Sequence, residues 1–334
     1  MGKMNSGTGS YNGESLSFPN EARRQMAMYN KMKILIAYDG SNHADAVLPD
    51  LRRAGLPKEA EAMVISIADV VMPSPPAYSY EASEARFSGQ VSAAASMAHE
   101  RALHALQESS KTALYASRLI RSQFPLWNLR AKSYTGSPAW KLIREADDWG
   151  ADLIVIGAPE RSALRRLIRG SVSKRVVAEA YSSVRIARAK YEGDDSPPKL
   201  VIGVNSSSET EALVSAVAAR DWPAGTEAHL ITVLGSSMDP AWKLIQKPGE
   251  NEWVRANQML KVSAAGLREA GLKVYQAIRF GDPERVLMAE AERLDADSIF
   301  VGSGRLDSPL KRFFFGSVSS AIVARATCSV EVVR

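Results

Sequence analysis

The sequence predicts an α/β protein with two open parallel sheets, each flanked by helices on both sides. Three observations support this prediction. Short apolar runs alternate with amphipathic stretches, the runs are apolar throughout, and the whole pattern occurs twice in 334 residues. Continuous apolar runs are typical of parallel strands that are buried on both faces. Strands that alternate with helices predict such a sheet, with helices covering its two faces.

Each repeat of the pattern begins with a short strand and a turn. Residues 33–41 read KILIAYDGS, and residues 199–207 read KLVIGVNSS. A helical stretch follows in both cases, then a turn that contains Pro57 or Pro223. The next apolar runs predict second strands at residues 62–68 and 228–234.

The later parts of the two repeats also match. A Gly-x-Pro sequence at 136–138 and at 281–283 predicts a helix start, because proline is favoured in the first turn. Strands are then expected at 151–157 and 296–302, and closing strands at 184–188 and 330–334. A glycine-containing basic loop that ends in Gly-Ser-Val-Ser precedes each closing strand. The pattern therefore reads strand, helix, strand, helix, strand, helix, strand in each repeat, which indicates a duplication.

These repeats divide the chain into segments. We predict a disordered tail at 1–31, a first domain at 32–190, a linker at 191–198 and a second domain at 199–334. The first repeat is longer because it holds a proline-rich insert at 72–76 and a long helix at about 90–123. The helical spacing predicts that one apolar stripe of this helix faces the core, formed by Met97, Leu103, Leu106, Leu114, Leu119 and Ile120.

The composition argues against several classes of protein. The 42 Lys and Arg residues exceed the 37 Asp and Glu residues only slightly, which does not favour a nucleic-acid-binding protein. A single cysteine, Cys328, excludes an intrachain disulfide, and we expect it to be a small buried apolar residue. The four histidines lack the spacing of metal ligands. No apolar run reaches the roughly 18 to 20 residues of a membrane span, and no signal peptide is evident, so we expect a cytoplasmic protein.

Two regions of each repeat are candidates for ligand binding. One is the turn after the first strand, Asp39-Gly40-Ser41 in the first repeat. The other is the loop that runs from Gly157 through Arg161 to Gly170, Ser171 and Val172. Glycines allow a ligand close to the backbone, and free N–H groups at the start of a helix suit phosphate. In open α/β sheets, ligands bind beyond the carboxyl ends of the strands, where both regions are expected.

This pattern resembles the universal stress protein family in its tandem form, over residues 32–190 and 198–334. Nucleotide-binding members of that family carry Gly, two residues, Gly, about nine residues and then Gly-Ser or Gly-Thr, with an Asp after the first strand. The resemblance implies five-stranded parallel sheets of the adenine nucleotide α hydrolase type. It also implies that two such units pair, often through the last strand. The two repeats are then expected to form an internal pseudo-dimer, and further homodimerisation stays open.

The resemblance also implies the nucleotide-binding positions. In the second repeat they fall on Asn205, Gly302, Gly304, Gly316, Ser317 and Val318, and in the first on Asp39, Gly40, Ser41, Gly157, Arg161, Gly170, Ser171 and Val172. Neither repeat has the complete motif. Glu160 replaces the second glycine of the first repeat, Asn205 replaces the carboxylate of the second, and Arg305 stands beside Gly304. Since Asp39 is retained, the sequence favours the first repeat.

Three functions follow. The favoured one is a stress-response regulatory protein that binds ATP or another adenine nucleotide, with Mg²⁺ accompanying ATP. The alternative is a regulatory or scaffold module that binds protein partners and no nucleotide, in which Asp39 and Ser41 only form a turn and a helix cap. The third is a slow ATPase. It is the least favoured of the three, because the sequence shows no catalytic base, metal-ligand set, P-loop or nucleophile elbow. We therefore expect a protein that is not an enzyme.

Overall fold

The computed structural model describes residues 31–73, 87–158, 171–188, 196–205, 209–235, 250–304 and 316–334. Residues 32–334 form one compact unit that holds both repeats. The predicted tail up to residue 30, most of the linker and most of the proline-rich insert lie outside the described residues. The domain boundaries stay a prediction.

The first repeat begins with a strand that the sequence predicted. Its elements are β1 (Lys33–Ala37), α2 (Asn42–Asp45), α3 (Val47–Arg53), β2 (Glu61–Ala68), α4 (Phe87–Gln123), β3 (Asn128–Thr135), α5 (Pro138–Trp149), β4 (Leu153–Gly157), α6 (Ser171–Glu179) and β5 (Ser183–Ala187). The second repeat contains β6 (Lys199–Gly203), α7 (Glu209–Ala218), β7 (Glu227–Leu234), α8 (Glu250–Glu269), β8 (Lys273–Phe280), α9 (Pro283–Leu294), β9 (Ser298–Gly302), α10 (Ser317–Arg325) and β10 (Ser329–Val333).

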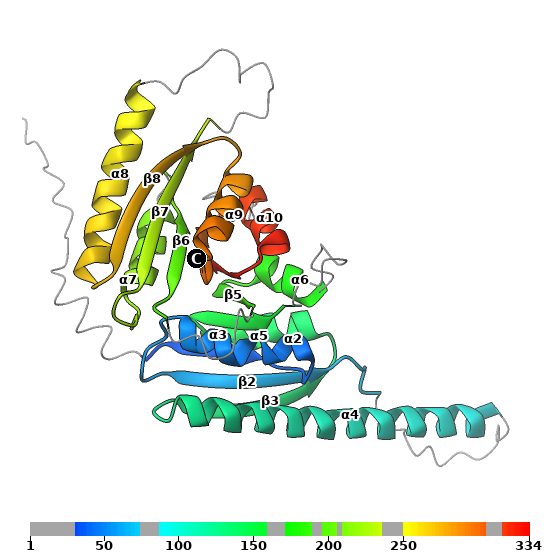
Figure 1. Ribbon diagram of the computed structural model, residues 1–334. Coiled ribbons are helices and arrows are strands. Elements are labelled where there is room, and N and C mark those ends of the chain that lie inside the picture. Colours follow the sequence, from blue (N-terminus) through cyan, green and yellow to red (C-terminus); the bar gives the residue numbers. More distant parts are fainter. Residues whose placement is uncertain are drawn as a thin grey trace, which may run out of the picture. The chain divides into compact units, whose positions relative to one another are not determined.

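The strands form one ten-stranded sheet in the order β3-β2-β1-β4-β5-β10-β9-β6-β7-β8. Neighbouring strands are parallel within each repeat. The two closing strands, β5 and β10, pair in the antiparallel direction, and Arg185 lies opposite Glu331. We call this β5–β10 pairing the seam (Figure 1). The predicted α/β class with parallel strands is confirmed, and the two predicted sheets are joined into one through their last strands.

The sequence pattern missed one strand in each repeat, β3 and β8. Both lie at the edges of the sheet, beside β2 and β7. In β3 only Leu129 is buried, and no residue of β8 is. Edge strands of this kind are partly exposed and carry polar residues, so they lack the continuous apolar run that marked the other strands. The five strands per repeat agree with the number that the family resemblance implied.

Equivalent residues begin and end the helices of the two repeats. Pro138 and Pro283 lie at the first positions of α5 and α9, as predicted. The Asp282 side chain caps α9 by accepting a hydrogen bond from the Arg285 amide at 3.0 Å. Both helices end on a left-handed residue, Gly150 with φ 67° and Asp295 with φ 51°. A left-handed residue lets the chain turn sharply into the following strand.

The two faces of the sheet are packed differently. On one face a single apolar core crosses the seam and joins the helices α5, α6, α9 and α10 of both repeats. On the other face each repeat has its own core, beneath α3 and α4 in the first and beneath α7 and α8 in the second. Cys328 is 3% exposed, so its predicted burial is confirmed.

The predicted apolar stripe of α4 is wrong. Met97, Leu103 and Leu114 are 55%, 43% and 48% exposed, and of the predicted set only Ile120 is buried. The buried face of this helix consists mainly of small residues, which are Ala102, Ser109, Ala113, Ala116 and Ser117. Small side chains let the helix lie close to β2 and β3, against which it packs (Figure 1).

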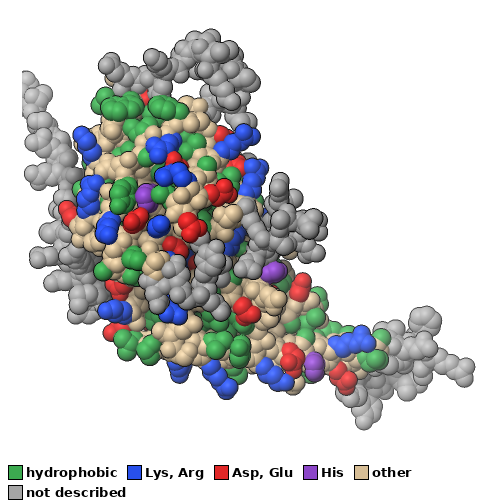
Figure 2. Space-filling view, in the orientation of Figure 1, with side chains coloured by type: hydrophobic (Ala, Val, Ile, Leu, Met, Phe, Trp, Pro, Cys, Tyr) green, Lys and Arg blue, Asp and Glu red, His purple; other side chains and the backbone are tan. Residues whose placement is uncertain are grey.

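Charges of both signs share the molecular surface. The face drawn in Figure 2 carries Lys and Arg side chains interspersed with Asp and Glu side chains. Such a mixture gives no basic stripe on this face of the kind that nucleic-acid binding uses.

Candidate functional site

A cleft of about 340 Å³ opens in the second repeat at the carboxyl ends of its strands. The strand order places β6 between β7 and β9, so the chain leaves β6 and β9 on either side of a switch point. Crevices at such points are the usual ligand sites of open α/β sheets. The cleft is lined by the ends of β6, β7 and β9 and by the first turns of α7, α9 and α10.

The cleft has an apolar interior and a polar rim. Its interior is lined by the apolar residues Val204, Leu213, Ile231, Val233, Leu287 and Val301. Its rim carries the sequence-predicted residues Asn205, Gly302, Gly304, Gly316, Ser317 and Val318. The structure therefore brings all six predicted residues of the second repeat together. A pocket of about 300 to 1,000 Å³ with apolar walls and a few placed polar groups is typical of a small-molecule site.

Two glycines of the rim are held against each other. Gly304 has a φ of +68°, and a Cβ at this position would lie 3.0 Å from the Gly316 Cα atom. The Gly316 amide donates to the Ser303 carbonyl at 3.1 Å, and the Ser319 hydroxyl donates to the Gly302 carbonyl at 2.7 Å. A larger side chain at Gly304 would separate the end of β9 from the start of α10.

A carboxylate lies at this rim that sequence reasoning missed. Glu209, the first residue of α7, accepts a hydrogen bond from the Gly304 amide at 3.0 Å through Oε2. Its Oε1 atom accepts from the Ser303 hydroxyl at 3.4 Å. Nothing in the sequence distinguished Glu209, because acidic residues are ordinary in the first turn of a helix.

The turn after β6 is closed by its own side chains. The Asn205 amide donates to the Thr210 hydroxyl oxygen at 3.1 Å, and the Thr210 hydroxyl donates to the Asn205 carbonyl. The same hydroxyl lies 3.3 Å from the Asn205 side-chain oxygen. Asn205 is exposed and stands where the first repeat has Asp39, so it offers a neutral amide to the cleft.

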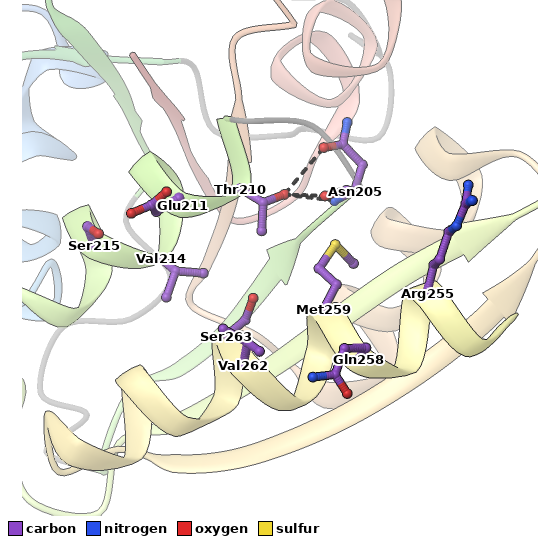
Figure 3. Close-up of a pocket in the computed structure, with 10 residues that line it drawn as sticks. All are labelled: Asn205, Thr210, Glu211, Val214, Ser215, Arg255, Gln258, Met259, Val262 and Ser263. Carbon is purple, nitrogen blue, oxygen red and sulfur yellow. Dashed lines mark hydrogen bonds between the residues drawn. The ribbon is translucent and has the colours of Figure 1, made fainter. Parts of the chain in front are cut away.

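A second hollow of about 560 Å³ lies between α7 and α8 (Figure 3). It shares Asn205 and Thr210 with the cleft, while its other lining residues lie on the two helices. Figure 3 shows Glu211 on α7, two residues beyond Glu209. Glu211 lines this hollow, whereas Glu209 lines the cleft.

In the first repeat the predicted turn is a helix cap. One Asp39 carboxylate oxygen accepts from the Ser41 amide at 3.0 Å and from the Ser41 hydroxyl at 2.6 Å. The Ser41 hydroxyl in turn accepts from the Ala44 amide at 3.3 Å, which caps α2. Gly40 has a φ of +76° and packs close to Thr112 of α4. The turn-and-cap role is thus observed, and Asp39 remains exposed.

The tyrosine before this turn is buried. Tyr38 is 3% exposed and its hydroxyl donates to the Asp45 carboxylate. Burial raises the pKa of Tyr38, and the hydrogen bond to Asp45 raises this pKa further. Tyr38 therefore helps to fix α2 beside the carboxyl end of β1.

Gly157 faces α2, the helix that follows this turn, from the neighbouring strand β4. A Cβ at Gly157 would lie 2.0 Å from the His43 carbonyl oxygen. Ser171 and Val172 begin α6, with Ser171 exposed and Val172 packed on the shared core. The remaining predicted residues of the first site, Arg161 and Gly170, lie outside the described residues, as do Glu160 and Arg305.

The two repeats differ at the position of Gly304. By alignment of the strand-end glycines Gly157 and Gly302, the residue of the first repeat that corresponds to Gly304 is Pro159. Proline has no backbone N–H, so this position cannot donate to a ligand. The first repeat has an exposed carboxylate at Asp39, and the second has a backbone amide at Gly304, which donates to Glu209.

Two other kinds of feature are absent from the described ranges, a metal-binding cluster and a membrane-spanning helix. No three His, Cys, Asp or Glu side chains of the described residues converge in a way that suits a metal ion. No helix in the described part of the chain combines the length and the apolar character that crossing a bilayer requires.

Comparison with known proteins identifies relatives over nearly all of the chain. The model of the universal stress protein family matches residues 31–188 and 198–334. A putative universal stress protein of Staphylococcus epidermidis is 26% identical over 174 residues, which cover 52% of this chain and 93% of that protein. A putative universal stress protein of Staphylococcus saprophyticus is 37% identical over 81 residues, which cover 24% of this chain and 48% of that protein.

Solved structures share the fold of the whole chain. The crystal structure of a universal stress protein from Archaeoglobus fulgidus matches with a TM-score of 0.60 at 18% identity and covers 90% of this chain and 98% of that one. A putative universal stress protein from Pseudomonas aeruginosa matches with a TM-score of 0.57 at 14% identity, over 92% and 94% of the two chains. At these identities the likeness shows a common fold.

Proposed function

The chain belongs to the universal stress protein family, and from that premise we propose that it is a stress-response regulatory protein that binds an adenine nucleotide. The observation that supports this proposal best is the cleft of the second repeat. Its apolar interior suits the faces of an adenine base, and its rim of glycine backbone suits phosphate. The same proposal assigns the protein to the cytoplasm and gives it a binding role without turnover.

The apolar part of the cleft provides the surface against which the adenine base would pack. Ile231 of β7, Leu287 of α9 and Val301 of β9 all line it, and each is at most 4% exposed. Residues this deeply buried are held by the core and form a surface that exists before a ligand arrives. A preformed apolar surface in the cleft lowers the entropic cost of binding a flat ring.

The first repeat remains a second candidate site, as the sequence suggested. Asp39 is exposed there and can accept hydrogen bonds from a ribose or a base, and the exposed Ser171 begins α6. ATP bound in either repeat would bring Mg²⁺ with it. The stoichiometry of bound nucleotide separates one occupied repeat from two.

The test has two parts. Nucleotide released from denatured purified protein is measured by chromatography, and the Tm is measured with and without ATP and Mg²⁺. Binding to the folded state alone stabilises it by about 2.7 kcal/mol at 100 times the Kd, so we expect saturating ATP to raise the Tm. Filling the cleft with Val233→Trp should reduce this shift, because Val233 lines it.

The matched control is Val262→Trp, which places the same side chain in the hollow between α7 and α8. This variant should keep the ATP-induced shift. Equal loss in both variants would argue against the cleft as the site. No released nucleotide together with no shift for the unmodified protein would overturn the proposal and favour the partner-binding module.

A further inference from the structure

The phosphate end of the second-repeat cleft already holds an anion, the carboxylate of Glu209. We propose that Glu209 is a built-in competitor for the phosphates of a nucleotide, so that it lowers the affinity of this cleft for a nucleotide without lowering its affinity for the corresponding nucleoside. This inference rests on the proposed function and goes beyond it, because it assigns the preference of the cleft to one side chain.

The geometry places the carboxylate on the donors that a phosphate would use. Oε2 of Glu209 lies 3.0 Å from the Gly304 amide nitrogen, and Oε1 lies 3.4 Å from the Ser303 hydroxyl. Gly304 has a positive φ, and backbone amides in such a conformation form small anion-binding concavities. Carboxylate and phosphate oxygens are both acceptors for these groups, so only one of them can occupy the donors at a time.

Glu209 is also packed tightly in this place. Its Oε2 atom lies 2.9 Å, and its Cβ atom 3.3 Å, from where a Cβ of Gly302 would be. Gly302 therefore leaves the space that the Glu209 side chain fills. The carboxylate is seated between the end of β9 and the start of α7, which fixes its position relative to the Gly304 amide.

Charge strengthens the competition. Within the described part of the chain, no cationic side chain forms an ion pair with Glu209. A phosphate that entered the cleft beside the carboxylate would meet a like charge in a partly enclosed site, where electrostatic interactions are weakly screened. A nucleotide must therefore displace Glu209, whereas a neutral nucleoside need not.

Among the described residues of the first repeat, no carboxylate is seen at the position of Glu209. By alignment of the two strand-one turns, its equivalent of Glu209 is His43, whose backbone rather than side chain lies against Gly157. The competitor thus belongs to the second repeat alone among the described residues, and it makes the two repeats respond differently to the same nucleotide.

The test compares adenosine with ATP in the full-length protein and in Glu209→Ala. Binding to the second repeat is followed by the amide resonance of Gly304 in isotope-labelled protein and by titration calorimetry. We expect the ATP affinity of this repeat to rise about tenfold or more in Glu209→Ala, because a hydrogen-bonded competing charge is removed. The adenosine affinity should stay within about twofold, since a nucleoside has no group at these donors.

Two further variants test whether the charge of Glu209 lowers the affinity for ATP. Glu209→Gln keeps the shape of the side chain without its charge. Its affinity for ATP should therefore lie between the affinities of the unmodified protein and of Glu209→Ala. Glu211→Ala removes the other acidic residue in the first turn of α7 and should leave both affinities unchanged, because Glu211 lines the separate hollow.

The outcomes distinguish this inference from the proposed function. If adenosine and ATP both bind and Glu209→Ala changes neither affinity, the inference is wrong and the proposed function stands. An equal gain for adenosine and ATP, or the same gain in Glu211→Ala, would also overturn it. If neither compound binds to any variant at the second repeat, this cleft is no adenine-nucleotide site, and the proposal and the inference fail there together.

Discussion

At the scale of single residues, the two glycines that end β4 and β9 are required by contacts rather than by backbone conformation. Neither Gly157 nor Gly302 has a positive φ. Each faces the helix that follows the first strand of its own repeat, through the His43 backbone of α2 in one case and the Glu209 side chain of α7 in the other. The sequence motif predicted both glycines, but the contacts that explain them appear only in the fold.

This difference predicts unequal effects of the same substitution. Gly157→Ala would place its Cβ 2.0 Å from the His43 carbonyl oxygen, so the backbone must move. We expect a loss of about 1 to 3 kcal/mol in the free energy of unfolding. Gly302→Ala meets the Glu209 side chain, at 2.9 Å from its Oε2 atom and 3.3 Å from its Cβ atom. A side chain shifts more easily than backbone, and alanine restricts the unfolded chain, so the loss should be smaller than for Gly157→Ala. Urea denaturation measures both, and equal losses would contradict the interpretation.

At the scale of elements, an ion pair from corresponding glutamates of α5 and α9 attaches each helix to the edge strand of its repeat. Lys132 of β3 lies 3.0 Å from Glu145 of α5, and Arg279 of β8 lies 2.5 Å from Glu290 of α9. Burial raises the pKa of Glu290, but the hydrogen bonds from Arg279 and Arg293 outweigh it and leave this pKa below its ordinary value. The pKa of Glu145 is lowered in the same way, with Lys132 as the main partner.

The lowered pKa of Glu290 makes stability depend on pH. A carboxyl group whose pKa is lower in the folded state adds stability above its unfolded pKa, and this stability is lost as the pH falls through the folded pKa. The unmodified protein should therefore lose more stability between about pH 5 and pH 3 than Glu290→Gln does. At neutral pH the substitution should cost about 1 kcal/mol or less, because Arg279 and Arg293 are partly exposed.

The control for this prediction is Glu292→Gln, on an exposed position of the same helix. Its stability should follow the pH profile of the unmodified protein. Thermal unfolding at a series of pH values gives the comparison. Parallel profiles for Glu290→Gln and the unmodified protein would show that Glu290 does not contribute in this way.

The sequence pattern predicts some of the elements correctly and misses others. Runs such as the one in β4 have both faces covered, so every residue is apolar and the strand is evident from the sequence. The edge strands β3 and β8 have one neighbour each and need no such run. On α4 Met97, Leu103 and Leu114 are exposed while the buried face consists mainly of small residues, because close packing on β2 and β3 leaves little room for large side chains. Spacing alone does not reveal which helical face meets the sheet.

At the scale of the whole molecule, the seam has the character of a two-fold interface within one chain. Arg188 donates to the carbonyls of Val323 and Cys328 at the end of α10, at 2.7 and 3.2 Å. Arg334, its equivalent in the second repeat, donates to the carbonyls of Val177 and Ser182 at the end of α6. Each repeat thus caps a helix of the other with the residue that follows its last strand.

The centre of the seam departs from this symmetry. Arg185 is fully buried and donates to both carboxylate oxygens of Asp50, at 2.7 and 2.8 Å, and to Glu331 at 3.3 Å. Arg220 forms an ion pair with Glu331 from the other side. Burial lowers the pKa of Arg220, whereas for Arg185 the attraction of Asp50 and Glu331 outweighs burial and raises the pKa.

This buried cluster predicts a large effect on stability. Arg185→Met leaves Asp50 buried without its main partner, and breaking a buried ion pair from one side typically costs about 3 to 5 kcal/mol. We expect a loss of that size in urea denaturation. Lys111→Met, which removes the exposed pair with Glu108, should leave the free energy of unfolding almost unchanged, because solvent screens this pair. A similar small loss for both variants would show that the cluster does not stabilise the seam.

The duplication, the α/β class, the parallel strands with two covered faces and the glycines of the second-repeat rim were all predictable from the sequence. These features depend on local apolar runs and on turn chemistry, which neighbouring residues set. Three other features become visible in the folded chain: the two sheets join at β5 and β10, Arg185 meets Asp50 and Glu331, and Glu209 reaches the Gly304 amide. Those contacts join residues from about 90 to 150 positions apart, and which of many distant partners meet depends on how all the elements pack together.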